Sequence, residues 1–327
     1  MRECCLCEDK KKSLLSIRDR KGNYLRTIAC QGCGLVHHDP LPTDQEITLY
    51  YKKNYRLDYK HTYLPKPKHI YRAGRIALER INRLTPWLSP NSRILDVGSG
   101  SGELCYLLNT HGYHAAGIEP NDGYGAYSRD KLRLNIHLGS FATASYPPES
   151  FHLITMFHVL EHILHPVTLL QQVHRWMRPE GFLIVEVPNV EATCVTPKNR
   201  FHFAHIYNFN ILTLEFIGIK CGFSVVNSYT SQDTEIIRVV FQKSCNLTVL
   251  ASAKDLLANN CQRIKTCLNN HTTAKHYFSR VPYLRLLQKG RRGILEKLNT
   301  FNRKNGLEIL HGLMPSHDPV ANLSSPK

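Results

Sequence analysis

The sequence predicts an α/β protein built on a doubly wound, mostly parallel sheet, with a cysteine-rich segment before it and a helical segment after it. Between residues 93 and 243, short apolar runs alternate with stretches of helical periodicity, which is typical of βαβ units. A glycine-rich loop separates the first predicted strand from the first predicted helix. Charge also changes at both boundaries: residues 1–90 carry a net +9, residues 91–240 carry −3 and residues 241–327 carry +10.

The order of the central elements follows from the apolar runs. A strand over 93–97 leads through the glycine loop into a helix that extends to about His111, and a second strand ends at Glu119. After a helix over 211–221, two apolar runs flank a polar turn, which predicts an antiparallel hairpin at one edge of the sheet. The other predicted elements are strands at 134–138, 151–157 and 182–187, a helix at 166–178, and the hairpin strands at 223–229 and 235–242.

Length and composition limit the class of protein. The 327 residues are 42% hydrophobic and 9% aromatic, which is enough for a sizeable core and argues against a disordered chain. No apolar run approaches the roughly 20 residues of a membrane-spanning helix, and the first residues lack the apolar stretch of a secretory signal. We therefore expect a soluble, cytoplasmic protein, in which eleven cysteines fit reduced thiols and a metal site better than a disulfide framework.

The segment after residue 243 is predicted to be helical and basic. Apolar residues from Leu250 to Leu268 follow three- and four-residue steps, which indicates one apolar helix face. A second helix is predicted over 281–302, where leucine and isoleucine are interspersed with arginine and lysine. The tail beyond Pro315 is expected to be frayed.

The loop Asp96-Val97-Gly98-Ser99-Gly100-Ser101-Gly102 predicts a nucleotide-like ligand. Glycines allow the backbone to approach a ligand closely at a helix N-terminus, and an acid that ends the second strand, Glu119, can accept both ribose hydroxyls. The spacing differs from the G-x-G-x-x-G of dinucleotide binders. An aspartate two positions before the first glycine would repel a pyrophosphate, but it suits a ligand that carries an amino group and a sulfonium.

From residue 91 to 242 the sequence resembles the class I S-adenosylmethionine-dependent methyltransferases. Residues 94–102 match the first motif of that family and 117–120 match its second. Residues 157–162 resemble the segment after its fourth strand, and 205–209 resemble its later active-site loop. The resemblance implies a Rossmann-like methyltransferase core with a seven-stranded, mostly parallel sheet that binds S-adenosyl-L-methionine.

The resemblance also implies roles for individual residues. Gly98, Gly100 and Gly102 would shape the loop under the methionine part of the cofactor, with Asp96 near its amino group and Glu119 on the ribose. Two positions depart from the family: His152 replaces an aspartate, and Phe141-Ala142 stands where an acid often follows Gly139, so apolar packing by Phe141 is the expected adenine contact. The predicted cofactor-binding residues are Asp96, Gly98, Ser99, Gly100, Gly102, Glu119, Pro120, Phe141 and His158.

The segment His158-Val159-Leu160-Glu161-His162 admits three interpretations. The H-x-x-E-H pattern of some zinc proteases requires a long helix, whereas this segment directly follows a predicted strand, over the cofactor crevice. His158 would lie near the cofactor, and Glu161 or His162 would act as a base or bind a divalent ion; alternatively, both merely cap the next helix. Methyl transfer requires a group that removes the acceptor's proton, and His205 or His162 titrates in the right range. The predicted catalytic residues are His205, His162 and Glu161.

Two C-x-x-C pairs, Cys4/Cys7 and Cys30/Cys33, predict an N-terminal zinc ribbon. They are separated by 22 residues, and four thiolates at this spacing can complete a tetrahedron around structural Zn²⁺. Gly34 suits the tight turn after the second pair, whereas Glu8 stands at the corresponding position of the first. Cys5 is a spare thiol that could replace Cys4, and cysteines that bind no metal are the alternative.

This ribbon and the tyrosine-rich segment after it resemble the N-terminal part of a subset of these methyltransferases, which includes sugar C-methyltransferases. Some of these tyrosines would cover the active site, where an aromatic face suits a sulfonium, and the alternative is packing on the core. The predicted units are a ribbon at 1–40, a tyrosine-rich helical linker or lid at 41–90, the methyltransferase core at 91–243 and a basic helical extension at 244–327. The tyrosines are Tyr50, Tyr51, Tyr55, Tyr59 and Tyr63.

The favoured function is methyl transfer to a small-molecule or glycan-type acceptor, with the basic flanks suited to an anionic one. An RNA methyltransferase is the alternative, because a zinc ribbon and positive flanks also describe a nucleic-acid grip. A non-catalytic, cofactor-binding interaction module is the second alternative. The basic C-terminal helices are also compatible with peripheral contact to an acidic membrane.

Overall fold

The computed structural model describes residues 3–54, 62–244, 257–302 and 305–314. Its centre is a seven-stranded sheet in the order β10-β11-β8-β7-β4-β5-β6, in which β4, β5, β6, β7 and β8 are parallel. β11 is antiparallel to both of its neighbours. The strands are β4 Arg93–Val97, β5 His114–Glu119, β6 Ile136–Leu138, β7 Phe151–Phe157, β8 Met177–Pro188, β10 Phe223–Thr230 and β11 Ile236–Lys243.

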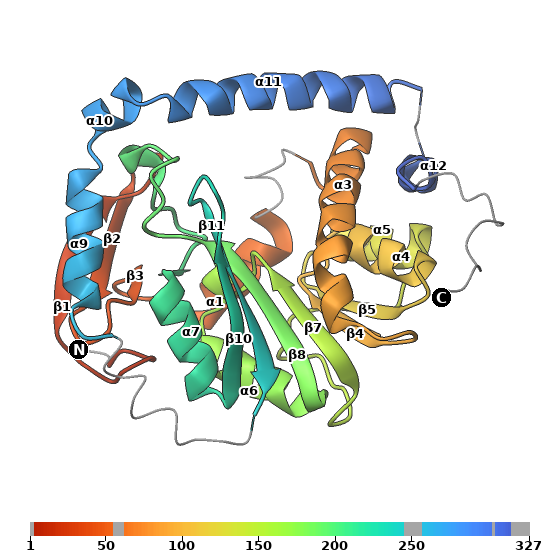
Figure 1. Ribbon diagram of the computed structural model, residues 1–327, viewed down its shortest axis with the longest axis horizontal. Helices are drawn as coiled ribbons and strands as arrows, with labels where there is room; N and C mark the ends of the chain where they lie inside the picture. Colours follow the sequence, from red (N-terminus) through yellow and green to blue (C-terminus); the bar gives the residue numbers. More distant parts are fainter. Residues whose placement is uncertain (1–2, 55–61, 245–256, 303–304, 315–327) are drawn as a thin grey trace, which may run out of the picture.

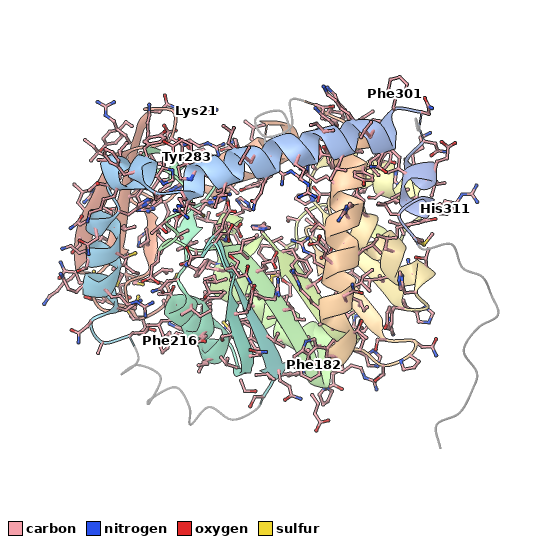
Figure 2. All side chains as sticks on the ribbon, turned by 45° about the horizontal axis from the view of Figure 1, so that its top comes forward. Lys21, Phe182, Phe216, Tyr283, Phe301 and His311 are labelled. Atoms are coloured by element: carbon pink, nitrogen blue, oxygen red, sulfur yellow. The ribbon has the colours of Figure 1, made fainter. Side chains whose placement is uncertain are left out.

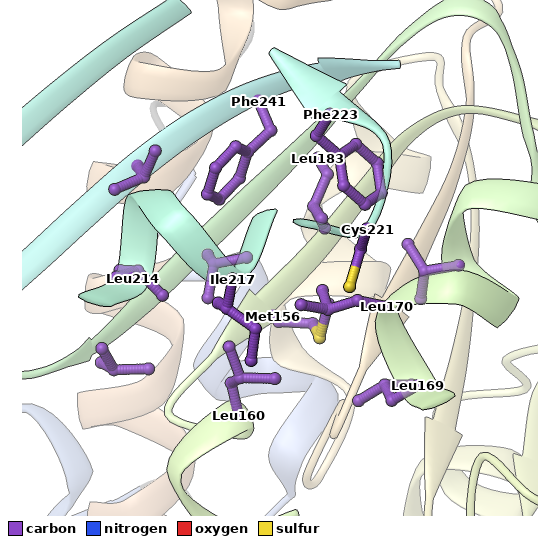
Figure 3. Packing of buried hydrophobic residues seen from close by; sticks show 14 of the residues in the cluster. Met156, Leu160, Leu169, Leu170, Leu183, Leu214, Ile217, Cys221, Phe223 and Phe241 are labelled. Atoms are coloured by element: carbon purple, nitrogen blue, oxygen red, sulfur yellow. The ribbon is translucent and has the colours of Figure 1, made fainter. Parts of the chain in front are cut away.

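Helices cover both faces of this sheet (Figure 1). One face packs against α6 (Pro166–Trp176) and α7 (Ile211–Lys220) in a cluster that Figure 3 shows from close by, with Leu170 and Ile217 meeting strand residues such as Leu183. The opposite face packs against α3 (Pro67–Leu84) and α4 (Glu103–Thr110). Successive strand residues enter opposite clusters, so the strands are buried on both sides as a doubly wound sheet requires. The fold class predicted from the sequence is confirmed.

The predicted boundaries differ from the structure at a few ends. The helix predicted over 166–178 ends at Trp176, and β8 begins directly at Met177 rather than at residue 182. The predicted hairpin is present, but β11 lies inside the sheet, between β10 and β8, and only β10 is at the edge. The remaining elements of this region are α5 Asp122–Lys131, two 3₁₀ turns, η3 Leu160–His162 and η4 Pro197–Asn199, and the short strand β9 Tyr207–Asn208.

A second, four-stranded sheet joins the N-terminal segment to the core. Its order is β1-β2-β3-β9, so a strand that follows the core's η4 turn completes the sheet of the cysteine-rich segment. The two parts also share one hydrophobic cluster, which includes Leu6 and Leu35 as well as core residues. The elements are β1 Lys12–Arg18, β2 Tyr24–Cys30, β3 Val36–His38, α1 Asp44–Leu49, the π-helical turn η1 Tyr50–Asn54, and the 3₁₀ turn η2 Thr85–Trp87 after α3.

The C-terminal helices run along the outside of the molecule (Figure 1). The helix predicted between Leu250 and Leu268 begins at Asn260, and Leu250 lies outside the described residues. The long helix α11 passes from the cysteine-rich part to α3, which it contacts. Within the described ranges, no helix combines the length and apolarity that crossing a membrane would require. The elements are α9 Asn260–Asn270, α10 Thr273–Phe278, α11 Val281–Thr300 and α12 Gly306–His311.

Candidate active site

A cavity of about 1510 Å³ opens at the carboxyl ends of the parallel strands. The strand order reverses at β4: β5 and β6 follow on one side of it, and β7 and β8 lie on the other. Ligands of open α/β sheets bind at such a switch point. The loop after β4, the segment after β7, the C-terminal end of β8 and one side of α3 all contribute to its lining.

The glycine loop has the backbone conformation that its sequence predicts. Gly98, Gly100 and Gly102 have φ of 77°, 60° and 85°, in the left-handed region that glycine adopts without steric cost. A Cβ on Gly98 would lie 2.5 Å from Cγ2 of Val159, so the loop also packs against the segment after β7. Gly98, Ser99 and Gly100 line the cavity, whereas Gly102 begins the helix behind them.

The two predicted cofactor acids lie at the ends of neighbouring strands and line the cavity. Asp96 is buried and accepts a hydrogen bond from Thr155 Oγ1 at 2.7 Å. Burial raises the pKa of Asp96 to about 6, although the Thr155 hydroxyl opposes the shift. Glu119 accepts hydrogen bonds from the backbone N–H of Gly100 at 2.7 Å and of Asn121 at 3.0 Å, so its carboxylate is held against the glycine loop. Three further predicted cofactor residues, Ser99, Pro120 and Phe141, also line this cavity.

His158, the last predicted cofactor residue, is placed by an unusual backbone conformation. Its φ is 59°, which is uncommon for a residue with a Cβ and which collects at functional sites. Its N–H donates to the carbonyl of Glu186 at 2.8 Å, and its side chain is 39% exposed to the cavity. Its Nδ1 lies 3.5 Å from Oε1 of Glu161.

Glu161, His162 and His205 form one cluster, in which a ligand atom of each lies within 4.8 Å of the others. The Glu161 side chain is only 1% exposed, and neither of its carboxylate oxygens has a hydrogen-bond partner among the described residues. A buried carboxylate without hydrogen bonds is costly. The site therefore has a strong acceptor that suits either a substrate hydroxyl or a divalent cation.

The geometry sets the tautomer of His162. Its Nδ1 lies 2.7 Å from the carbonyl oxygen of Ala204, which can only accept, so Nδ1 carries the proton. In the neutral ring the lone pair is then on Nε2, which lies 3.7 Å from Oε1 of Glu161. Burial, and to a smaller extent the positive charge that the neighbouring His202 and His162 would carry, keeps the pKa of His205 well below its ordinary value. The His205 ring is therefore neutral at physiological pH.

Two alternative interpretations of the H-x-x-E-H segment are wrong. Residues 160–162 form a short 3₁₀ turn rather than part of a long helix, so the protease geometry is absent. Helix α6 begins at Pro166 with His165 as its N-cap and no capping side chain, so Glu161 and His162 do not cap it.

The four ribbon cysteines come together as predicted. Cys4 Sγ lies 3.6 Å from Cys33 Sγ, and Cys7 Sγ lies 3.4 Å from Cys30 Sγ, with all four within 4.8 Å. Thiolates at ~2.3 Å from a tetrahedral Zn²⁺ are ~3.8 Å apart, so the set fits this ion. Cys4 rather than the spare Cys5 occupies the cluster.

The turns after the two cysteine pairs share one backbone conformation. Gly34, after the second pair, has φ of 79°. Glu8, at the corresponding position of the first pair, has φ of 69°, a left-handed conformation that is strained for a residue with a Cβ. Lys220 of α7 donates to the carbonyls of Cys5 and Leu6 and to the Glu8 carboxylate, so the core supports this turn.

The tyrosine-rich segment places Tyr51 at the cavity. Its hydroxyl donates to the Ala204 carbonyl at 3.1 Å, and its ring lies edge-on to the ring of His162, with centroids 5.6 Å apart. Tyr50 packs on Tyr51, and Tyr63 is 49% exposed. Tyr55 and Tyr59 lie outside the described residues.

The sequence reasoning missed Glu186 and its partners. Glu186, near the end of β8, accepts hydrogen bonds from Arg80 of α3 at 2.9 Å and from Arg238 of β11 at 2.6 Å, at the cavity wall. Burial would raise its pKa, but Arg80, His158 and Arg238 lower it to about 2. The sequence did contain a signal for Glu186, since it is an acid inside the apolar run 182–187. Its two arginine partners are distant in sequence and could not be found in the same way.

This topology, with a glycine-loop crevice and an acid on the next strand, is the fold of the class I S-adenosylmethionine-dependent methyltransferases. Residues 68–228, just under half of the chain, match the family model described as "Methyltransferase domain".

Two relatives in sequence each match about a third of the chain. The chain is 28% identical over 101 residues to a ubiquinone biosynthesis O-methyltransferase of Bradyrhizobium diazoefficiens, which covers 30% of this chain and 40% of that protein. It is 28% identical over 131 residues to a tRNA U34 carboxymethyltransferase of Pseudoalteromonas translucida, which covers 37% of this chain and 41% of that protein. The matched segments thus span about two fifths of these relatives.

Solved structures resemble about half of the chain. A chain of the complex between the Haloferax volcanii Trm112 methyltransferase activator and a methyltransferase has a TM-score of 0.47 and 12% sequence identity, and the match covers 54% of this chain and 95% of that one.

Proposed function

We propose that the protein transfers a methyl group from S-adenosyl-L-methionine to a small-molecule or glycan-type acceptor bound in the cavity. The cavity volume of about 1510 Å³ carries this proposal, because pockets for one small ligand measure ~300–1,000 Å³. There is room for the cofactor and a second molecule. Exposed cations at the lining, Arg83 and Lys52, suit an acceptor that bears a phosphate or carboxylate.

The cofactor would lie along the ends of β4 and β5. Asp96 would face the methionine amino group, Glu119 the ribose hydroxyls and Phe141 the adenine, with Gly98, Ser99, Gly100, Gly102 and Pro120 forming the cradle and His158 its outer wall. The bound sulfonium supplies the electrophilic methyl group. The chain itself must align the acceptor, which is worth ~7–11 kcal/mol in well-oriented reactions, and must take up the acceptor's proton.

Within this proposal, the cluster of Glu161, His162 and His205 receives that proton. The buried Glu161 carboxylate accepts no hydrogen bond within the described part of the chain and its Oε1 lies 3.7 Å from Nε2 of His162, and a positioned base contributes ~10²–10⁴-fold. Tyr51 holds the Ala204 backbone that also fixes the His162 tautomer. The same cluster would fit a divalent ion.

The cysteine cluster would hold one structural Zn²⁺. The sulfur separations of 3.4 and 3.6 Å support this proposal, as does the absence of any disulfide among these cysteines. The ion would stabilise the sheet that β9 completes and, through it, the segment that carries His205. We expect about one zinc per chain in the wild type and loss of the zinc in Cys33→Ser. Substantially less than one zinc in the wild type would contradict the assignment of a zinc ribbon.

The acceptor is identified by incubating the protein with methyl-labelled S-adenosylmethionine and with separate fractions of small metabolites, glycans and RNA. Label in the small-metabolite or glycan fraction supports the proposal. Label in the RNA fraction would support the alternative function, an RNA methyltransferase, for which the similarity to a tRNA U34 carboxymethyltransferase is the motive. Cofactor binding without any labelled product would favour the non-catalytic module.

The proton-accepting role is tested on the labelled reaction. Glu161→Gln and His162→Asn should lower kcat by ~10²-fold or more, whereas the exposed His114→Gln is the matched control. Turnover that is lost in a chelator and restored by Mg²⁺, with the ribbon zinc still present by metal analysis, would assign the cluster to a divalent ion instead.

A further inference from the structure

Helix α11 is amphipathic in the reverse sense: its charged face contacts the protein and its apolar face points to solvent. The inner face is held by Arg285, which donates to Glu235 at 2.6 Å, and by Glu296, which accepts from Arg72 of α3 at 2.6 Å. Glu296 is 4% exposed, although it is the only acid of the helix. Apolar residues usually face inward on a helix that covers a folded core, so the reversed orientation requires an explanation.

The outer face carries a continuous apolar stripe. At 100° per residue, positions 283, 287, 294, 298 and 301 fall within about 60° of one another, on the side opposite Arg285 and Glu296. Figure 2 shows Tyr283 and Phe301 near the two ends of this surface. The exposed fractions are 57% for Tyr283, 71% for Leu287, 62% for Ile294, 70% for Leu298 and 85% for Phe301.

The stripe continues beyond the helix and is flanked by cations. Phe278, at the end of α10, is 92% exposed. Arg291 and Lys297 are exposed on either side of the stripe on α11, and no acid of α10 or α11 is exposed with them. Such an apolar face with basic borders is the pattern of a helix that lies in a membrane interface, where leucine and aromatic residues enter the acyl boundary and cations meet anionic headgroups.

We propose that α11 and the end of α10 form a docking surface for an anionic lipid bilayer, the α11 surface, made of Phe278, Tyr283, Leu287, Ile294, Leu298 and Phe301 with their basic borders. Charge selects this occupant. A second copy of the chain would bring the same cations together on a surface without an exposed acid, which is repulsive. Nucleic acid would match the charge but would leave the apolar stripe in water.

The position of the α11 surface connects it to the cavity. Arg285 binds Glu235, in the turn between β10 and β11, and Arg72 belongs to α3; Glu235 and residues of α3 also line the cavity. Docking of α11 on a membrane would therefore hold in place the two parts of the cavity wall that the helix connects, the turn between β10 and β11 and helix α3. The proposal does not depend on methyl transfer, and its test uses binding alone.

The test is flotation of the full chain with vesicles of phosphatidylcholine alone and of an equimolar mixture with phosphatidylglycerol. We expect the protein to float with the anionic vesicles, less as salt is raised, and to bind the neutral ones far more weakly. The apolar variant Leu287→Ser/Ile294→Ser/Leu298→Ser should reduce the partition coefficient at least about tenfold, because three large apolar side chains would no longer enter the acyl boundary. The basic variant Arg291→Gln/Lys297→Gln should reduce binding to anionic vesicles and weaken its salt dependence.

A matched control carries Leu14→Ser and Ile17→Ser on β1, which are 56% and 48% exposed on another element. It should float like the wild type. Three outcomes would overturn the proposal: equal flotation of the apolar variant and the control; RNA binding that falls in the basic variant but persists in the apolar one, with no vesicle binding; or a wild-type dimer by light scattering that the apolar variant converts to monomer. Cofactor calorimetry on the same variants separates a failure here from a failure of the proposed function.

Discussion

Replacing Glu186 by glutamine should destabilise the core more than any other single loss of charge in the cavity wall. Arg80 and Arg238 are 19% and 14% exposed in their side chains, and both contact the Glu186 carboxylate. Glutamine keeps the size but removes the counter-charge of two largely buried cations, a change that typically costs ~3–5 kcal/mol. We expect a loss of about 3 kcal/mol in the free energy of unfolding at pH 7.

The lowered pKa of Glu186 follows from the same interaction. It falls from 4.5 to about 2, and at 1.36 kcal/mol per unit this corresponds to about 3 kcal/mol. A lowered carboxylate pKa stabilises the fold above about pH 4.5, and this stabilisation is lost as the pH falls toward 2. The gap between wild type and Glu186→Gln should therefore shrink by about 2 kcal/mol between pH 6 and pH 3.

The assay is urea unfolding followed by tryptophan fluorescence, because Trp176 is buried in the core and Trp87 packs against it. Asp130→Asn, which removes the exposed pair with Arg129, is the control and should leave the transition unchanged. A loss below about 1 kcal/mol in Glu186→Gln, or a gap that is independent of pH, would refute the reasoning.

Three further predictions concern the glycine loop, the cofactor acid and the ribbon. Gly98→Ala should lower the affinity for S-adenosylmethionine at least about tenfold, because the added Cβ would meet Val159. The control Gly112→Ala, with φ of 84° but nothing within 4 Å, should lower the free energy of unfolding by the ~1–2 kcal/mol of backbone strain and leave binding unchanged in calorimetry. Equal losses of binding in the two variants would contradict the packing argument. Burial raises the pKa of Asp96 to about 6, so binding of the cationic cofactor should strengthen as the pH rises through 6 and should lose this dependence in Asp96→Asn, which calorimetry at several pH values would show. Glu8→Gly should raise the free energy of unfolding by about 1 kcal/mol at unchanged zinc content, because glycine adopts the φ of 69° without strain. A lower free energy of unfolding would mean that the lost contact between Glu8 and Lys220 is worth more than the strain that is relieved.

The sequence predicts the local features well because they depend on neighbouring residues. The glycine loop, the βαβ alternation and the cysteine pairs each carry their geometry within a few residues, and the structure has them where they were expected. The interaction of Glu186 with Arg80 and Arg238 could not be predicted, since its members are on a helix and two strands separated by 106 and 52 positions.

The direction that a helix faces was likewise beyond sequence alone. The periodicity of α11 predicts an apolar face and a basic one, but only Glu235 and Arg72, from distant parts of the chain, show that the charged face is the inner one. For the same reason, pairing of β9 with β3 was unexpected, and it is this pairing that brings the His205 segment to the cysteine-rich part.

The most direct test of the account is titration calorimetry of the wild type, Glu119→Gln and the exposed control Glu149→Gln with S-adenosylmethionine. Glu119 is the acid that the glycine loop holds at the end of β5, so we predict one site per chain in the wild type and in Glu149→Gln, and at least about a tenfold weaker site in Glu119→Gln. Absence of binding to the wild type, or equal binding by all three proteins, would contradict the assignment of this crevice to the methyl donor.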